Sequence, residues 1–169
     1  MKRLILIIFL LLTFKLYAPN DPDYQEKVKD FTEWYHEQLN KQLRIARLMY
    51  AIREVESGHD YEKSGMSGEY GAYQFTRATW RMYSYLYFDR LLPMTKEYQD
   101  SVAYLKVKNL VNAGFSDLEI ASIWNCGKPD WRGRKGVNKY GVRYDVPNHV
   151  LKIERVLAER NCAQRWWYG

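Results

Sequence analysis

A glutamate at the end of an apolar helical stretch is the first residue of this chain whose setting suggests chemistry. Ile45, Met49 and Ile52 recur at a spacing of four and three, which predicts a helix that carries Glu56 on the same face. Gly58 would then end that helix. A carboxyl group on a core-facing stripe loses water and also meets the negative end of the helix dipole, and both effects favour its protonated form. Glu56 is therefore a candidate general acid, which must hold its proton near neutral pH.

A neighbouring acid on the same helix provides the contrast. Glu54 points to roughly the opposite side of the predicted helix and should lie in water. The competing interpretation of Glu56 is an ordinary helix-end glutamate that turns outward or pairs with Arg53. The helix by itself does not decide between the two.

Two further blocks follow Glu56 in a fixed order. Glycines at 58, 65, 68 and 71 turn the backbone repeatedly before a new helical stretch begins at Thr76. A later block reads Ala121-Ser-Ile-Trp-Asn-Cys-Gly127. Together with the acid, these blocks resemble the SLT-type lytic transglycosylases and goose-type lysozymes of the lysozyme-like superfamily. The matching segments run from about Leu48 to Val150 and read Glu56-Ser57, Ser64 to Gly68, Gly71-Ala72-Tyr73-Gln74, Thr79-Trp80 and the Ala121 to Gly127 block.

The resemblance implies a mainly helical, lysozyme-like domain with a cleft, and a peptidoglycan lytic transglycosylase that works without cofactor or metal. Glu56 would protonate the β-1,4 linkage between N-acetylmuramic acid (MurNAc) and N-acetylglucosamine (GlcNAc), and would then act as base on the muramoyl C6 hydroxyl. The product would be a 1,6-anhydro sugar. The expected substrate-binding residues are Ser57, Ser64, Ser67, Tyr73, Gln74, Trp124, Asn125 and Tyr144.

The chain departs from the family pattern at two places. Tyr73 stands where the family usually has a methionine that lines the sugar cleft. The late family tyrosine that approaches the glutamate has no clean counterpart, since His149 occupies that register and Tyr144 lies just upstream. A single histidine near a helix start is more often a surface or capping residue than a catalytic one.

A second carboxylate would change the reaction. Asp60, Glu62 and Glu69 follow Glu56 in the glycine-rich stretch, but no helical spacing holds any of them on its face. If one of them stabilised the oxocarbenium ion or activated water, the enzyme would be a lysozyme-type muramidase that hydrolyses the same bond. A non-catalytic cell-wall-binding module is the alternative outside the enzymes.

The N-terminal segment predicts export. Lys2 and Arg3 followed by an apolar run over residues 4–14, too short to span a bilayer, are typical of a secretory signal at residues 1–18. An uncleaved membrane tether is the alternative, because Pro19 would hinder cleavage after Ala18. Residues 19–169 then form the catalytic domain, periplasmic or extracellular, acting on glycan strands of the wall alone or with an envelope-spanning secretion or conjugation complex.

Charge and cysteines limit the remaining classes. Three of the 26 basic residues lie in the signal segment, which has no acid, so the rest of the chain is only mildly basic and a nucleic-acid-binding protein is not favoured. In an exported protein, Cys126 and Cys162 could form a disulfide. The competing interpretation is a small buried residue at 126 and a surface thiol at 162.

Helical periodicity runs through most of the sequence. It predicts helices over residues 23–57 with a break near Asn40, over 76–86, from about Tyr98 to Gly114, over 116–124, and from Val150 to about Trp166. Ser116 and Glu119 form a capping box at the start of the fourth of these segments. Strand alternation is nowhere sustained, but the turn over residues 65–74 could hold one short β-hairpin.

Overall fold

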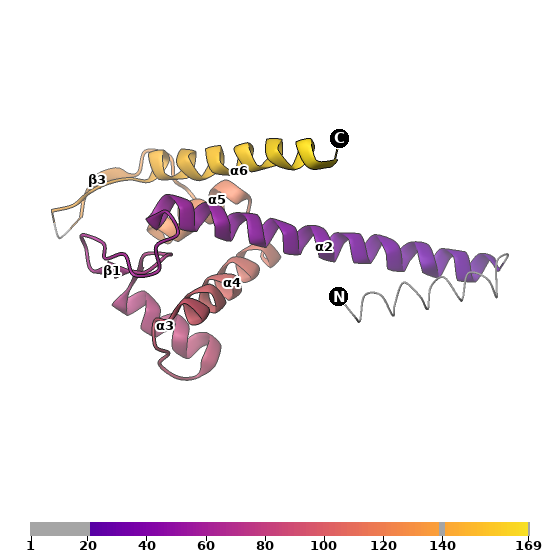
Figure 1. Ribbon diagram of the computed structural model, residues 1–169, viewed down its shortest axis with the longest axis horizontal. Coiled ribbons are helices and arrows are strands. Elements are labelled where there is room, and N and C mark those ends of the chain that lie inside the picture. The colour runs from indigo at the N-terminus through magenta and orange to yellow at the C-terminus, as the bar shows by residue number, and fades with distance from the viewer. Residues whose placement is uncertain (1–20, 139–140, 169) are drawn as a thin grey trace. The chain divides into compact units, whose positions relative to one another are not determined.

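The chain is mainly helical, as predicted. The computed structural model describes residues 21–138 and 141–168, and side chains as far as residue 159. Within these residues it contains five helices and two small antiparallel sheets of two strands each (Figure 1). The helices are α2 (Pro22–Ser57), α3 (Arg77–Phe88), α4 (Lys96–Asn112), α5 (Asp117–Cys126) and α6 (Val146–Tyr168), and the strands are β1 (Glu69–Tyr70), β2 (Phe75–Thr76), β3 (Lys135–Val137) and β4 (Arg143–Asp145).

Helix α2 is continuous through Asn40, so the predicted break there is wrong. An asparagine in a helix interior costs only about 0.7 kcal/mol relative to alanine, and that cost is too small to end a helix by itself. The chain divides into two compact units, residues 1–41 and 42–169. The described part of the first unit is the N-terminal portion of α2, whose side chains are mostly exposed.

The core lies in the second unit. The C-terminal portion of α2 contributes Leu48 and Ile52, which are fully buried against apolar residues of the later helices, including Val107, Ile120 and Ile153. This is the apolar stripe that the periodicity before Glu56 predicts. The acid therefore follows directly after a buried stripe that fixes the orientation of the last turns of α2.

The start of α5 is fixed by two sets of bonds. Ser116 and Glu119 form the predicted capping box. Arg44 on α2 also binds the start of α5: its Nε lies 2.7 Å from Asp117 Oδ1, and its Nη2 donates to the Phe115 carbonyl at 2.6 Å. Helix α5 then buries Ile120 and ends at a left-handed glycine. Trp124 and Asn125 lie on its last turn as a result.

A short hairpin is present after Glu56, over residues 69–76 and not within the predicted 65–74. Strands β1 and β2 pair Glu69 with Thr76 and Tyr70 with Phe75, and residues 71–74 form the connection. Gly71 has a φ of +85°, which a residue with a side chain rarely adopts. A second hairpin, β3 with β4, was not predicted from the sequence.

A buried glutamine joins this hairpin to α4. Gln99 is fully buried; its Oε1 accepts from Ala72 N at 2.8 Å, and its Nε2 donates to the carbonyls of Tyr61 and Met94. A Cβ at Gly71 would lie 2.1 Å from the Gln99 amide oxygen, so the glycine is also required by the close approach. One side chain thus satisfies three backbone groups on separate segments.

Replacing Gln99 with leucine should test the importance of this link. The variant would leave three buried backbone groups without their partner, and we expect a loss of roughly 3 kcal/mol in the free energy of unfolding, measured by urea denaturation. Asn112→Leu, at an exposed position of the same helix, is the control and should change stability little. Equal stability of the two variants would contradict the role given to Gln99.

The N-terminal predictions fall outside the described part of the chain. The proposed signal segment, residues 1–18, lies among residues that the structure does not describe. Among the described helices, none is long and apolar enough to cross a membrane.

Candidate functional site

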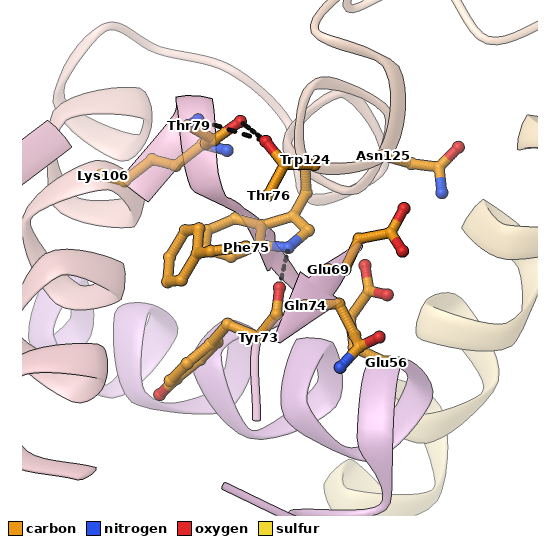
Figure 2. A pocket seen from close by; sticks show the side chains of 10 residues that line it. All are labelled: Glu56, Glu69, Tyr73, Gln74, Phe75, Thr76, Thr79, Lys106, Trp124 and Asn125. Atoms are coloured by element: carbon orange, nitrogen blue, oxygen red, sulfur yellow. Dashed lines mark hydrogen bonds between the residues drawn. The ribbon is translucent and has the colours of Figure 1, made fainter. Parts of the chain in front are cut away.

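A polar pocket opens at the end of α2, between the β1–β2 hairpin and helices α4 and α5 (Figure 2). Its volume is about 240 Å³. It brings together five predicted site residues from segments far apart in the sequence. The lining residues are Glu56, Glu69, Tyr73, Gln74, Phe75, Thr76, Thr79, Lys106, Trp124 and Asn125.

Glu56 is a largely buried acid whose side chain is only 17% exposed. Burial raises the pKa of Glu56 to about 7 against the opposing effect of the Lys106 ammonium; the Glu69 carboxylate adds to the rise, and Lys63 acts against it. Glu56 is therefore substantially protonated near neutral pH and can donate a proton there. The prediction of an acid turned inward, rather than an ordinary exposed helix-end glutamate, is supported by this geometry.

His149 lies beside the acid. Its Nε2 is 3.7 Å from Glu56 Oε1, and the histidine side chain is 12% exposed. Burial lowers the pKa of His149 to about 4, with Lys152 acting in the same direction, so the ring is neutral at physiological pH. Nε2 has no hydrogen-bond partner among the described residues. His149, which stands in the register of a tyrosine in the family that the sequence resembles, thus lies beside the predicted acid.

A second carboxylate shares the pocket. Figure 2 shows Glu69 on β1 and Glu56 on α2 both directed into it. Glu69 Oε2 accepts from Ser67 N at 2.9 Å, which anchors the side chain to its own turn. Of the three acids considered as a second carboxylate, Glu69 is the one that lines the pocket.

Lys106 on α4 is the cation of the pocket. The residue is 7% exposed, and its Nζ lies 4.0 Å from the centre of the Trp124 ring system and 5.1 Å from that of Tyr83. Burial lowers the pKa of Lys106 to about 8, while Glu56 acts in the opposite direction. Lys106 therefore remains mostly charged near neutral pH.

Aromatic rings make up the floor of the pocket. Trp124 Nε1 donates to the Tyr73 carbonyl at 3.3 Å, and Phe75 packs against both rings. Tyr73 is fully buried, and its hydroxyl donates to Asp100 Oδ1 at 2.7 Å. The ring and hydroxyl of Tyr73 therefore serve packing and anchoring, and the Lys106 ammonium covers part of the ring of Trp124, an expected substrate-binding residue.

Gln74 and Asn125, the two amide residues expected to bind substrate, differ in whether their side chains are available to a ligand. Gln74 Nε2 donates to the carbonyls of Gly71 at 2.8 Å and Lys63 at 3.1 Å, so both of its N–H groups are used within the protein. Asn125 is exposed at the edge of the pocket (Figure 2). Asn125 is therefore the better placed of the two to contact a ligand.

Four predicted substrate-binding residues lie outside this pocket. Ser57 is buried behind it and donates through Oγ to the Ala72 carbonyl at 3.0 Å. Ser64 and Ser67 line an adjoining hollow of about 960 Å³, which shares Glu69, Phe75 and Thr76 with the pocket. Tyr144 lies on β4 and lines a separate hollow of the β3–β4 hairpin.

The predicted disulfide is not tested by these residues. Cys126 Sγ lies 3.7 Å from Ser122 Oγ and forms no disulfide within the described part of the chain. The side chain of Cys162 lies outside the described part of the chain. The bridge between them stays a prediction.

Lys106 was not found from the sequence, although a signal was present. It follows Gln99, Val102 and Ala103 at helical spacing on the buried face of α4. A charged residue on a core-facing stripe is the same signal that identified Glu56. His149 and Glu69 were considered, but their sequence positions could not show that they reach the acid.

Comparison with other proteins does not add to this picture. No family model, curated protein or solved structure gives a significant match to the chain. Among the described residues, no group of three or more histidine, cysteine or acidic side chains is arranged to hold a metal ion.

The raised pKa of Glu56 predicts a specific pH dependence of stability. Its pKa in the folded state lies above the ordinary glutamate value of 4.5, so its stabilising contribution is complete below about pH 4.5 and is lost as the pH rises through about 7. Glu56→Gln removes this ionisation and keeps the side-chain shape. The free energy of unfolding of the variant minus that of the wild type should therefore increase by roughly 2.5 kcal/mol from pH 5 to pH 8, as measured by urea denaturation.

The control for this measurement is Glu26→Gln, which removes an exposed carboxylate from the same helix; Glu54 is less suitable because it lies 2.9 Å from His59 Nε2. If Glu56→Gln and the wild type differ in unfolding free energy by the same amount at pH 5 and pH 8, then Glu56 ionises as freely as a solvated acid and the prediction is wrong.

Proposed function

We propose that the protein is a peptidoglycan lytic transglycosylase of the lysozyme-like superfamily that cleaves the MurNAc–GlcNAc β-1,4 linkage. The observation that carries the proposal is the buried Glu56, whose pKa is raised to about 7 in a polar pocket. Lining by Gln74, Trp124 and Asn125, the residues that carry the family resemblance, supports the same assignment. The lysozyme-like fold and the enzymatic activity are part of this proposal.

The reaction needs one carboxyl group that works twice. Protonated Glu56 donates its proton to the glycosidic oxygen, and the C1–O bond breaks as the GlcNAc hydroxyl leaves. The muramoyl C6 oxygen then attacks C1, and its proton passes to the Glu56 carboxylate. The acid is regenerated, no water is consumed, and the product is a 1,6-anhydro sugar. A pKa near 7 suits both roles, because neither protonation state is costly to reach.

A muramidase is the second candidate, and Glu69 is the observation that favours it. This carboxylate lines the same pocket and raises the pKa of Glu56. In a hydrolase, Glu69 would stabilise the oxocarbenium ion or activate water. In the transglycosylase its charge would serve only to keep Glu56 protonated.

The secretory signal expected at residues 1–18 is compatible with peptidoglycan as the substrate. We infer that residues 1–18 direct the protein out of the cytoplasm, where it meets the wall's glycan strands either alone or as part of an envelope-spanning secretion or conjugation complex. Cleaving the signal or retaining it as a tether would both leave residues 19–169 outside the cytoplasm.

The central test is mass spectrometry of the products from purified murein digested by the mature protein. The transglycosylase should release muropeptides lighter by one water than those of a hydrolase. Glu56→Gln should lower the rate by roughly 10²- to 10⁴-fold, since it cannot donate the proton. Glu54→Gln should keep full activity. Hydrated products from the wild type would refute the transglycosylase, and full activity of Glu56→Gln would refute the acid.

Glu69→Gln separates the two enzymes by rate and by pH dependence. In the transglycosylase we expect a loss of less than about tenfold, because Glu69 takes no part in bond making, whereas a muramidase should lose roughly 10²-fold or more. Removing this negative charge should also lower the pKa of Glu56, so the fall in rate on raising the pH should begin at a lower pH. The pH–rate profiles of variant and wild type measure both effects.

A further inference from the structure

Lys106 occupies a place on α4 where an apolar residue would be more stable. Its buried neighbours on the helix are Val102, Ala103 and Val107, which all pack into the core. An ammonium group taken out of water costs several kcal/mol unless a partner compensates it. Lys106 therefore lowers the stability of the fold, and core packing alone does not explain why a lysine occupies this position.

The contacts of Lys106 leave its N–H groups available. No ion pair in the described part of the chain involves this residue. Its Nζ instead lies near the rings of Trp124 and Tyr83, at 4.0 and 5.1 Å from their centres. Ring faces attract a cation through their electron density and do not take up its hydrogen bonds as a carboxylate would. The aromatic rings thus position the ammonium without neutralising it.

We infer that Lys106 forms a carboxylate-binding site in the pocket and selects glycans that carry a negative charge. The inference rests on the proposed function, because it assigns a subsite to the same cleft. Neutral groups of a sugar, such as hydroxyls and acetamides, can be met by polar lining residues such as Thr76 and Asn125, and they do not require a buried cation. A carboxylate does benefit from one, since a charge-assisted hydrogen bond in a desolvated pocket is about twice as strong as a neutral one.

The surrounding charges are compatible with this assignment. Protonated Glu56 is neutral, and it is the acid whose charge Lys106 senses. Glu69 is anchored by Ser67 N and forms no ion pair with Lys106 among the described residues. His149 is neutral near physiological pH and adds no charge. The positive charge of Lys106 therefore lines the pocket without a carboxylate partner among the described residues, and it is available to a ligand there.

Two parts of peptidoglycan offer such a carboxylate. In peptide-free glycan it ends the lactyl group of each MurNAc, whereas in peptide-bearing glycan that group is an amide and the carboxylates belong to the stem peptide. Both sources share one chemistry, and oligosaccharides of matched length distinguish them. GlcNAc oligomers, which lack lactyl groups and peptides, serve as the uncharged reference.

The test measures binding without cleavage, in the Glu56→Gln background of the mature protein. Dissociation constants for the three oligosaccharides are obtained by isothermal titration calorimetry, before and after adding Lys106→Met. We expect Lys106→Met to weaken binding of at least one carboxylate-bearing ligand by tenfold or more, and to change binding of the GlcNAc oligomer less than twofold. The charged ligand that loses affinity identifies the source of the carboxylate.

Two further variants test whether an effect of Lys106→Met is specific to the charge at position 106. Lys108→Met is the control, because Lys108 lies on the same helix beside the Tyr104 ring but outside the pocket lining. Lys106→Gln provides a second neutral variant if methionine disturbs the fold, which circular dichroism would reveal. Loss of affinity for all three ligands alike, or for none of them, would overturn the carboxylate site. If the Glu56→Gln protein with Lys106 intact binds none of the three, the proposed function itself fails together with the subsite.

Discussion

The desolvation of one carboxyl group at the C-terminal end of α2 is the constraint on which the rest of the structure depends. Glu56 follows a stripe of residues that must be buried, so its helix cannot turn the acid toward bulk water without exposing Leu48 and Ile52. A buried charge would be costly, and the group responds by retaining its proton. The helix that builds the core therefore also sets the protonation state of the acid.

Holding the acid in place requires anchors on the side away from the pocket. Asp100 on α4 accepts from the hydroxyls of Tyr61 and Tyr73 and lies 3.2 Å from Arg53 Nη1. Arg53 belongs to the turn of α2 just before Glu56, so this network ties that turn and the β1–β2 hairpin to α4. The charges of Arg53 and Asp100 offset each other there. The polar network can thus fix the geometry of the pocket without adding an unbalanced charge to it.

The sequence predicted those features that depend on local periodicity and turn chemistry. The orientation of Glu56, the capping box at Ser116 and a short hairpin after the acid all follow from spacings of a few residues. The continuity of α2 through Asn40 did not, because weak helix preferences are overridden by their neighbours. Tertiary packing brings Lys106 into the same pocket as Glu56 and places His149 Nε2 3.7 Å from its carboxyl group, and no local pattern encodes that packing. The β3–β4 hairpin has three-residue strands, too short to show alternation.

The arrangement of charges around Glu56 explains how a single carboxyl group could act as acid and then as base. Before proton transfer, Glu56 is neutral and Lys106 is a cation of the same pocket; after transfer, the positive charge of Lys106 stabilises the new carboxylate. Glu69 acts in the opposite direction and favours return of the proton. Burial has the largest effect and raises the pKa of Glu56, while Lys106 lowers this pKa and Glu69 raises it further. The opposing pair keeps both states within reach, and a mechanism in which the same group gives up a proton and takes one back depends on that balance.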